Sequence, residues 1–272
     1  GHYQYQSWWG YDSLPEIKSV EGKSVPYASE LNNEQFANYI FRDRDSVAKS
    51  WIERGASGWR LDVANEVDSA FWREFRKELL EGEYYRGATL KQGEQPLILG
   101  EIWDDASQYF LGDQYDSVMN YRFRGAVLDF LRNGKAEEAD ARLMAIKEDY
   151  PREAYYSLMN LIGSHDTARA VFLLGGGTDS FERAEQDPNY NAELGKQRLK
   201  LAAIFQMGYP GAPTIYYGDE AGVTGSKDPD NRRTYPWGSE DQDLLEHYKK
   251  VGQIRRQHMD VLAHGDIRTV YA

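Results

Sequence analysis

Three short segments of the chain each end an apolar or alternating run in an acidic residue. They are Gly58-Trp59-Arg60-Leu61-Asp62, Leu99-Gly100-Glu101 and Ser164-His165-Asp166. The apolar residues before each acid are typical of strands, and the carboxyl ends of parallel strands meet at one face of a sheet. We therefore expect the three carboxylates to converge on one pocket. Two such groups, one as a nucleophile and one as an acid, are what hydrolysis of a glycosidic bond requires.

The first two acids have different surroundings in the sequence. Strand alternation places Arg60 on the same face as Asp62, and a guanidinium beside a carboxylate favours its charged form and orients it. No basic residue adjoins Glu101 in the sequence, and the Ile102 and Trp103 that follow it are apolar. We expect them to form an apolar wall that favours the protonated acid.

The composition excludes several classes of partner. A formal charge of −12, from 32 basic and 44 acidic residues, opposes binding to phosphate backbones and anionic membranes, so we expect neither nucleic acid nor a membrane as a partner. No apolar run approaches the ~18 residues of a spanning helix. The absence of cysteine excludes disulfides, thiol nucleophiles and thiolate metal sites.

Strand and helix patterns alternate along the chain, which is typical of α/β proteins with parallel sheets. We expect five strands, at residues 58–62, 97–99, 116–121, 155–163 and 213–217. We expect helices around residues 36–51, with a break near 42–43, and around residues 68–79, 123–131, 136–147, 201–205 and 244–256. Five strands are too few for a complete eight-stranded barrel.

Several segments closely resemble signature regions of the α-amylase family of glycoside hydrolases. The three main ones are Gly58-Trp59-Arg60-Leu61-Asp62-Val63-Ala64-Asn65-Glu66, Gly100-Glu101-Ile102-Trp103-Asp104-Asp105-Ala106 and Ser164-His165-Asp166-Thr167. Residues 8–16 resemble the exit from the small domain inserted after the family's third barrel strand. Residues 218–220 and 228–232 resemble the loop after the eighth strand. Residues 63–66, Trp103 and residues 116–121 resemble neopullulanase and amylopullulanase types, which attack pullulan, starch or cyclodextrins.

The resemblance implies a partial (β/α)8 TIM barrel, covering about barrel strands four to eight with the helices that follow. Residues 1–30 would end a domain B-like inserted domain, residues 31–260 would form the partial catalytic barrel, and residues 261–272 would begin a C-terminal β-domain. The family's first signature region and first three strands have no counterpart in this sequence. We therefore expect an incomplete piece of an enzyme, inactive or poorly folded alone, whose full-length parent protein is active.

The same resemblance assigns roles to individual residues. Asp62 would be the nucleophile and Glu101 the acid/base of a retaining hydrolysis of α-1,4, and possibly α-1,6, glucosidic bonds. Asp166 would be the third carboxylate, which binds ring hydroxyls and helps distort the sugar. The expected substrate-binding residues are Arg60, His165, Asn65, Glu66, Trp103, Asp228 and Arg232. The expected partner is an α-glucan oligosaccharide or polysaccharide.

The resemblance implies no cofactor for the chemistry. Classical α-amylases carry a His that takes part in calcium binding at the position of Glu66. We therefore do not predict the family's conserved calcium site within this chain, and a structural calcium ion elsewhere is left open.

Each residue also has a plainer interpretation. Arg60 and Asp62 could form a structural ion pair, and Glu101 could be a solvated strand end. His165 and Asp166 could form a turn with a local hydrogen bond. The loop at residues 228–232, rich in Asp, Pro and Asn, could be only a loop.

Three other functions remain open at this point. One is a transglycosylase of the same family, in which a sugar hydroxyl replaces water. Another is a glucan-binding relative without catalysis, against which the presence of all three carboxylates argues. The third is a divalent-metal hydrolase using Asp62, Glu101, His165 and Asp166; the missing HExxH motif and the scarcity of His argue against it.

Overall fold

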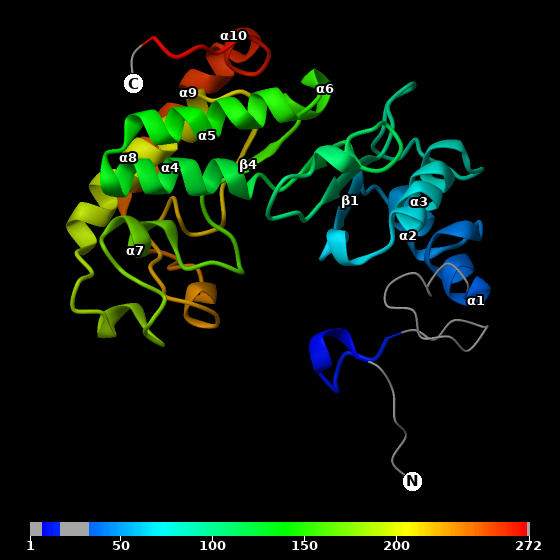
Figure 1. Ribbon diagram of the computed structural model, residues 1–272, viewed down its shortest axis with the longest axis horizontal. Helices are drawn as coiled ribbons and strands as arrows, with labels where there is room; N and C mark the ends of the chain where they lie inside the picture. The colour runs from blue at the N-terminus through cyan, green and yellow to red at the C-terminus, as the bar shows by residue number, and fades with distance from the viewer. Residues whose placement is uncertain (1–6, 17–32, 271–272) are drawn as a thin grey trace. The chain divides into compact units, whose positions relative to one another are not determined.

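The computed structural model describes residues 7–16 and 33–270 of the chain (Figure 1). The chain divides into two compact units. The first unit consists of Gly1–Ile102 and Gln108–Val118, and the second of Trp103–Ser107 and Met119–Ala272.

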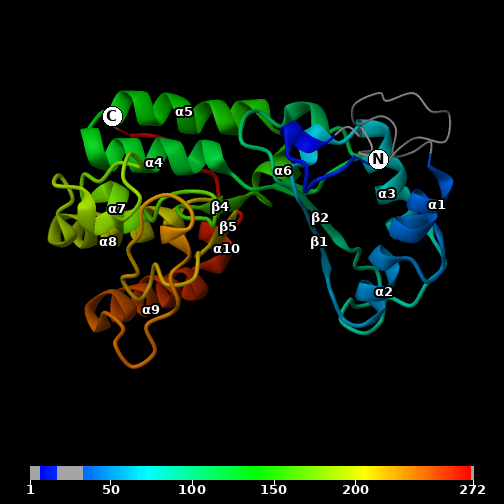
Figure 2. The same cartoon turned by 90° about the horizontal axis from the view of Figure 1, so that it is seen from below.

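The first unit contains a parallel sheet with the strand order β1-β2-β3. Its strands are β1 (Gly58–Leu61), β2 (Leu97–Gly100) and β3 (Ser117–Val118). Figure 2 shows β1 and β2 side by side, and their register pairs Leu61 with Gly100. Because the two strands end level, the next residues, Asp62 and Glu101, occupy adjacent positions at the carboxyl edge of the sheet.

Three helices follow the pattern expected from the sequence of the first unit. They are α1 (Glu34–Ala37), which continues into a π-helical turn at Asn38–Arg42, α2 (Val47–Glu53) and α3 (Ser69–Glu81). The predicted break after Arg42 is confirmed. Asp68 caps α3 by accepting a hydrogen bond from the Ala70 N–H at 2.6 Å. The face of α3 with four-residue spacing packs into an aromatic cluster around Phe71 and Phe75.

The second unit pairs β4 (Met159–Leu161) with β5 (Ala212–Thr214) in parallel. Its helices are α4 (Tyr121–Asn133), α5 (Ala136–Asp149), α6 (Arg152–Tyr155), α7 (Ala170–Leu174), α8 (Ala192–Gly208), α9 (Gln242–Gln257) and α10 (Met259–Leu262). The main packing pairs are α4 on α5, α7 on α8 and α8 on α9. Asn160 of β4 is fully buried and donates to the Pro210 carbonyl at 2.6 Å. This hydrogen bond links β4 to the residues that directly precede β5.

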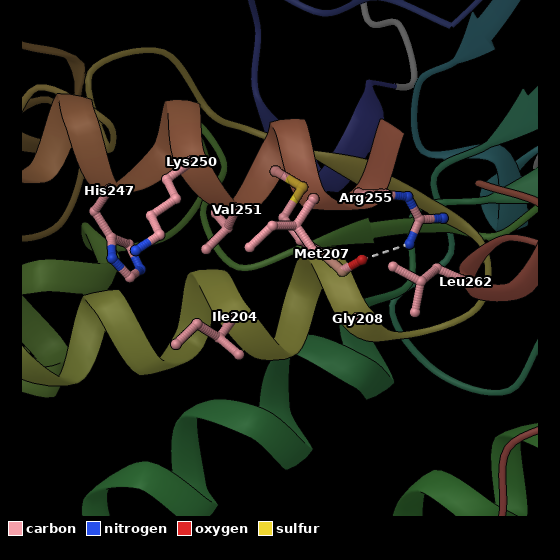
Figure 3. Close-up of a pocket in the computed structure, with 9 residues that line it drawn as sticks. Ile204, Met207, Gly208, His247, Lys250, Val251, Arg255 and Leu262 are labelled. Atoms are coloured by element: carbon pink, nitrogen blue, oxygen red, sulfur yellow. Dashed lines mark hydrogen bonds between the residues drawn. The ribbon is translucent and has the colours of Figure 1, made fainter. Parts of the chain in front are cut away.

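An apolar pocket of about 400 Å³ lies between α8, α9 and α10 (Figure 3). At one end of it Arg255 of α9 donates to the Met207 carbonyl at 2.7 Å. The same buried guanidinium donates to the carbonyls of Tyr209 and Gly211. Arg255 therefore fixes the end of α8, and no predicted site residue lines this pocket.

The five expected strands and their parallel pairing are confirmed within the described residues. Three are clearly shorter than expected, because α4 begins at Tyr121, residues 152–155 form α6 and residues 215–217 lie in the loop after β5. The short helices α6, α7 and α10 were not predicted, since four or five residues are too few to show a periodicity.

The proposed domain boundaries and the barrel strand numbers stay predictions. The boundary expected at residue 30 lies outside the described residues, as do positions 1–6, 17–30 and 271–272 of the two expected terminal segments. Among the described residues, no helix is long and apolar enough to span a bilayer.

Candidate active site

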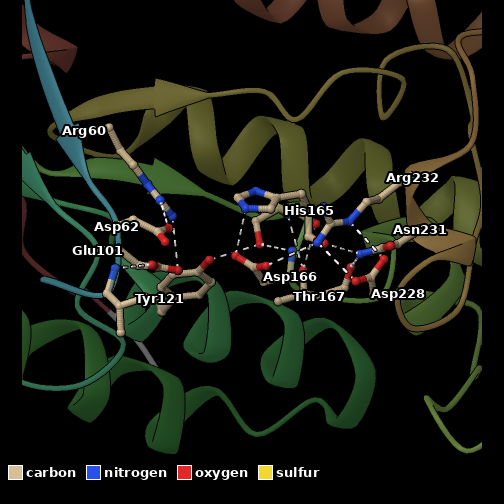
Figure 4. Close-up of polar contacts among 12 residues, drawn as sticks. Arg60, Asp62, Glu101, Tyr121, His165, Asp166, Thr167, Asp228, Asn231 and Arg232 are labelled. Atoms are coloured by element: carbon tan, nitrogen blue, oxygen red, sulfur yellow. Dashed lines mark hydrogen bonds and ion pairs between the residues drawn. The ribbon is translucent and has the colours of Figure 1, made fainter. Parts of the chain in front are cut away.

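A single arginine joins the two carboxylates at the ends of β1 and β2. Arg60 Nη1 donates to Asp62 Oδ1, and Arg60 Nη2 lies 3.1 Å from Glu101 Oε1 (Figure 4). The predicted pairing of Arg60 with Asp62 is therefore confirmed. The Asp62 side chain is largely exposed, whereas Glu101 is buried.

The surroundings of Glu101 differ from the expected apolar wall. Its Oε1 faces Arg60, and its Oε2 accepts a hydrogen bond from the Val63 N–H at 2.9 Å. No basic residue adjoins Glu101 in the sequence, but strand pairing brings Arg60 to it across the sheet. The contacts seen here are those of a carboxylate with two donors.

Val63 reaches Glu101 by means of an uncommon backbone conformation. Its φ of 46° lies in the left-handed region, which is costly for a β-branched residue, by about 1–3 kcal/mol. The turn directs its N–H at the carboxylate and follows directly on Asp62, the first residue after β1. The hydrogen bond to Glu101 offsets part of the strain.

Asn65 and Glu66 lie in the short 3-10 turn Ala64–Glu66 that follows. Asn65 is exposed, Glu66 is half-buried, and the Asn65 amide lies 3.4 Å from Glu66 Oε1. The structure therefore brings both residues close to Asp62 in the chain and leaves Asn65 open to solvent. Their predicted contact with substrate stays a prediction.

The second unit carries the third acid on a turn after β4. His165 Nε2 lies 3.1 Å from Asp166 Oδ2, and the Asp166 N–H donates to Ser164 Oγ at 3.2 Å. Ser164 Oγ also accepts a hydrogen bond from the Tyr121 hydroxyl at 3.0 Å. The turn with local hydrogen bonds is therefore real, and it leaves both side chains partly exposed.

The loop after β5 brings a second group of predicted residues to Asp166. Arg232 Nε lies 3.0 Å from Asp228 Oδ1, and Arg232 Nη2 lies 3.6 Å from Asp166 Oδ1 (Figure 4). The three residues form a chain of alternating charges on one side of the unit. Asp228 and Arg232 therefore belong to the surroundings of Asp166, beyond being part of a polar loop.

Trp103 lies in the same unit and stacks on Tyr121. The ring centroids are 3.8 Å apart and the planes differ by 6°, while Trp103 remains 44% exposed. Through the Tyr121 hydroxyl this stack is linked to Ser164 and the Asp166 turn. An exposed flat ring fixed from behind is suited to contact with a sugar face.

Two residues of this site were given no role from the sequence. Asn231 Nδ2 donates to the carbonyls of His165 at 2.7 Å and Thr167 at 2.8 Å, so it spans Asp166. Arg169 is fully buried and donates through Nε to the Asn231 carbonyl at 2.8 Å. The sequence feature that could have pointed to Arg169 is its place as a single cation among the apolar residues that follow Thr167.

The predicted residues thus fall into two groups. Those of the first unit are Arg60, Asp62, Asn65, Glu66 and Glu101, and those of the second are Trp103, His165, Asp166, Asp228 and Arg232. That all three acids face one pocket stays a prediction. Within the described residues, no group of three or more His, Asp and Glu is arranged to hold a metal ion.

A buried acid lies behind the second group. Asp219 Oδ1 is 3.3 Å from Arg169 Nη1, and the whole side chain is buried. Burial raises the pKa of Asp219 to about 7, and Glu220 acts in the same direction, while Arg169 and Arg124 oppose the shift. Between about pH 4 and pH 7 the folded chain therefore holds a proton that the unfolded chain has lost.

Replacing Asp219 with Asn is expected to change how stability depends on pH. A raised carboxyl pKa makes the free energy of unfolding fall as the pH rises through this window, by about 1.4 kcal/mol per unit at most. From about pH 5 to pH 7, the Asp219→Asn variant should therefore gain about 2 kcal/mol relative to the unmodified chain. Urea unfolding at the two pH values measures this difference; an unchanged or reversed difference would show that Arg169 keeps Asp219 ionised throughout.

Comparison with known proteins finds a matching family model and similar relatives. The family model described as alpha amylase, catalytic domain, matches residues 27–240. An amylopullulanase of Thermoanaerobacterium thermosulfurigenes is 46% identical over 290 residues, which cover 98% of this chain and 14% of that protein. Neopullulanase 2 of Thermoactinomyces vulgaris is 37% identical over 281 residues, which cover 99% of this chain and 42% of that protein.

Solved structures give the same result. A cyclomaltodextrinase with 34% sequence identity matches with a TM-score of 0.68, over 93% of this chain and 38% of that chain. The chain therefore spans from 14% to 42% of the length of these three relatives.

Proposed function

The chain belongs to the α-amylase family of glycoside hydrolases, and from this premise we propose that it carries the catalytic carboxylates of a retaining α-glucan hydrolase. The observation that carries the proposal is the contact of Arg60 with both Asp62 and Glu101 at the carboxyl ends of two paired parallel strands. A parallel α/β sheet uses this edge for chemistry. One cation shared by two acids orients both toward the same space.

In the first step Asp62 acts as the nucleophile. A carboxylate oxygen of Asp62 forms a bond to the anomeric carbon while the glycosidic C–O bond breaks, and the electron pair of that bond goes to the leaving oxygen. Glu101 gives its proton to this oxygen. The exposed and ion-paired state of Asp62 fits a group that must be charged and reachable.

In the second step Glu101 acts as a base. It takes a proton from water, the water oxygen forms a bond to the anomeric carbon, and the ester bond to Asp62 breaks. The product keeps the α configuration, because the carbon has been attacked twice from opposite sides.

Glu101 must carry a proton at the start of this cycle, whereas both of its oxygens face donors in the structure. The contact with Arg60 is the one that can be released. Asp62 remains a partner of Arg60 when the Glu101 contact opens, so the partly exposed guanidinium keeps a charged partner. Arg60 is therefore proposed to orient both acids and to let Glu101 change its protonation state.

The second unit supplies substrate binding in this proposal. Asp166, with His165 beside it, binds ring hydroxyls, and Asp228 and Arg232 bind sugar further from the cleaved bond. Trp103 offers an exposed ring on the leaving-group side. Asn65 and Glu66 are proposed to influence which linkage is accepted.

We propose that β1 to β5 correspond to strands four to eight of a (β/α)8 barrel. The chain then needs the remaining strands of its parent protein for full activity, and is inactive or poorly folded alone. Support comes from its parallel sheets of three and two strands, and from the small share of each relative that it spans. The substrates proposed for the parent protein are starch, pullulan or cyclodextrins, in line with the names of the relatives.

The anomeric configuration of the first products tests the proposed reaction. Proton NMR spectra are recorded during the first minutes of maltotetraose hydrolysis by the parent protein, before mutarotation. Retention predicts that the new reducing end appears as the α anomer. Early accumulation of the β anomer would contradict the roles of Asp62 and Glu101, since it requires direct attack by water.

The products from pullulan distinguish the linkages cleaved. Panose would indicate cleavage of α-1,4 bonds, and maltotriose cleavage of α-1,6 bonds. Products longer than the substrate, formed from maltotetraose, would favour the transglycosylase alternative. The isolated 272-residue chain is measured beside the parent protein, and equal activity of the two would overturn the proposed need for further strands.

A further inference from the structure

Arg169 is a buried cation that lies behind the predicted substrate-binding residues. Its side chain is fully buried, and the Cζ of its planar guanidinium lies 4.1 Å from the Tyr216 ring centroid and 4.6 Å from that of Tyr217. Burial of a guanidinium is costly unless its donors are paired. Its partners therefore show what it holds in place.

Those partners all belong to the loop after β5. Arg169 Nε donates to the Asn231 carbonyl at 2.8 Å, and Nη1 donates to the Tyr217 carbonyl and lies 3.3 Å from Asp219 Oδ1. The backbone N–H of Arg169 also donates to the Gly225 carbonyl at 3.0 Å. One residue just after the Asp166 turn thus donates hydrogen bonds to the loop after β5 at four positions.

Asn231 in turn is hydrogen-bonded to the Asp166 turn. Its amide nitrogen donates to the carbonyls of His165 and Thr167, the residues on either side of Asp166. Its own carbonyl is the acceptor of Arg169 Nε, so Arg169 and Asn231 close a ring of contacts around the turn. The next residue, Arg232, is the one whose guanidinium approaches the Asp166 carboxylate.

We propose that Arg169 is a positioning residue for Asp166, and that it acts through Asn231 to set the place of the Asp166 carboxylate relative to Arg232. Arg169 touches no reacting group itself. The inference deepens the proposed function and rests on it, because it assumes that Asp166 binds the sugar.

Lysine cannot replace Arg169 in this role. A single ammonium on a flexible stem can neither cover both tyrosine rings as a planar guanidinium does nor direct separate donors at Asn231, Tyr217 and Asp219. The charge that balances Asp219 is retained, whereas the link to Asn231 is lost. Arg169→Lys therefore tests the hydrogen bond to Asn231 while keeping a positive charge beside Asp219.

The second unit contains a matched control. Arg255 is also buried, and its guanidinium donates to three backbone carbonyls, those of Met207, Tyr209 and Gly211, none of which belongs to the Asp166 turn. Arg255→Lys should cost stability in the same way. It should leave the geometry of the Asp166 turn unchanged.

The experiment compares both variants in the parent protein at a temperature where each is folded by circular dichroism. Arg169→Lys is expected to lower kcat for maltotetraose by roughly 10²-fold, because a displacement near 1 Å at a reacting site has an effect of this size. Arg255→Lys is expected to keep kcat within about twofold. A second variant, Asn231→Asp, replaces the two amide donors and should lower kcat on its own. Combined with Arg169→Lys in a double variant, it should add little to the effect of Arg169→Lys.

Hydrogen exchange gives a readout that does not depend on activity. Amide exchange in residues 164–168 should become faster in Arg169→Lys and in Asn231→Asp, and stay unchanged in Arg255→Lys. If exchange and kcat are both unchanged in a folded Arg169→Lys protein, the positioning role is refuted. The proposed function stands in that case, provided that Glu101→Gln inactivates the parent protein. If exchange changes but the unmodified parent protein cleaves no glucan, the proposed function fails, and with it the role in catalysis.

Discussion

Replacing Asp62 with Asn is expected to reduce kcat for starch or pullulan by about 10⁴-fold or more. The amide has nearly the same shape but cannot form the ester bond to the anomeric carbon. Arg60 keeps Glu101 as a partner in this variant, so the fold of the first unit should change little. The loss should therefore appear in turnover, with little change in the midpoint of unfolding.

The measurement is steady-state hydrolysis by the parent protein, followed as released reducing ends. Asp179→Asn is the matched control, because Asp179 is an exposed acid in the loop between α7 and α8 and lies outside both groups of site residues. It should retain full activity. An Asp62→Asn protein that keeps more than a few per cent of the parent activity would rule out Asp62 as the nucleophile.

Replacing Glu101 with Gln is expected to reduce kcat for glucans by about 10²- to 10⁴-fold, the range of general acid–base catalysis. The effect should depend on the leaving group. A substrate such as maltosyl fluoride, whose leaving group needs no proton, should still form the bond to Asp62 in the first step. The variant should therefore accumulate the covalent intermediate, since the second step lacks its base.

Burst kinetics with maltosyl fluoride measures this prediction. The Glu101→Gln variant should release about one equivalent of fluoride rapidly and then slow down, and Glu137→Gln, at an exposed position of α5, should behave like the unmodified protein. Equal losses on fluoride and on starch, with no burst, would argue against an acid/base role. In that case the contacts of Glu101 with Arg60 and Val63 would be structural.

Local patterns in the sequence were sufficient to place the two acids of the first unit. The alternation in residues 58–62 puts Arg60 beside Asp62, and the apolar run before Glu101 forms β2 as expected. Both signals are local, since they depend on residues within five positions of each acid. Strand ends and their acids can therefore be read from the sequence.

The contact between Arg60 and Glu101 could not be predicted in the same way. It depends on the register of β1 and β2, which pairs Leu61 with Gly100 across a helix and two loops. Nothing in either segment fixes this register. For that reason the sequence suggested an apolar wall where the structure has a cation.

Arg169 and Asn231 were missed for a related reason. Their hydrogen bonds link residues 62 to 66 positions apart, and a buried arginine has no sequence pattern of its own. Asn231 belongs to a segment that resembles the family, but the resemblance gave a role only to its neighbours Asp228 and Arg232. The helix α7, which begins directly after Arg169, is too short to be predicted.

The identity of the nucleophile is the central claim, and covalent trapping tests it most directly. The parent protein is incubated with 5-fluoro-α-maltosyl fluoride, which should form the glycosyl-enzyme and release it slowly, and is then digested with trypsin. Cleavage after Arg60 and Arg73 gives a peptide of residues 61–73 that contains Asp62, Glu66 and Asp68. Mass spectrometry with fragmentation should place one fluoromaltosyl group on Asp62 and none in the Asp62→Asn protein. A label on any other residue would contradict the proposed mechanism. So would an active enzyme that hydrolyses the reagent, or is inhibited by it, without becoming labelled.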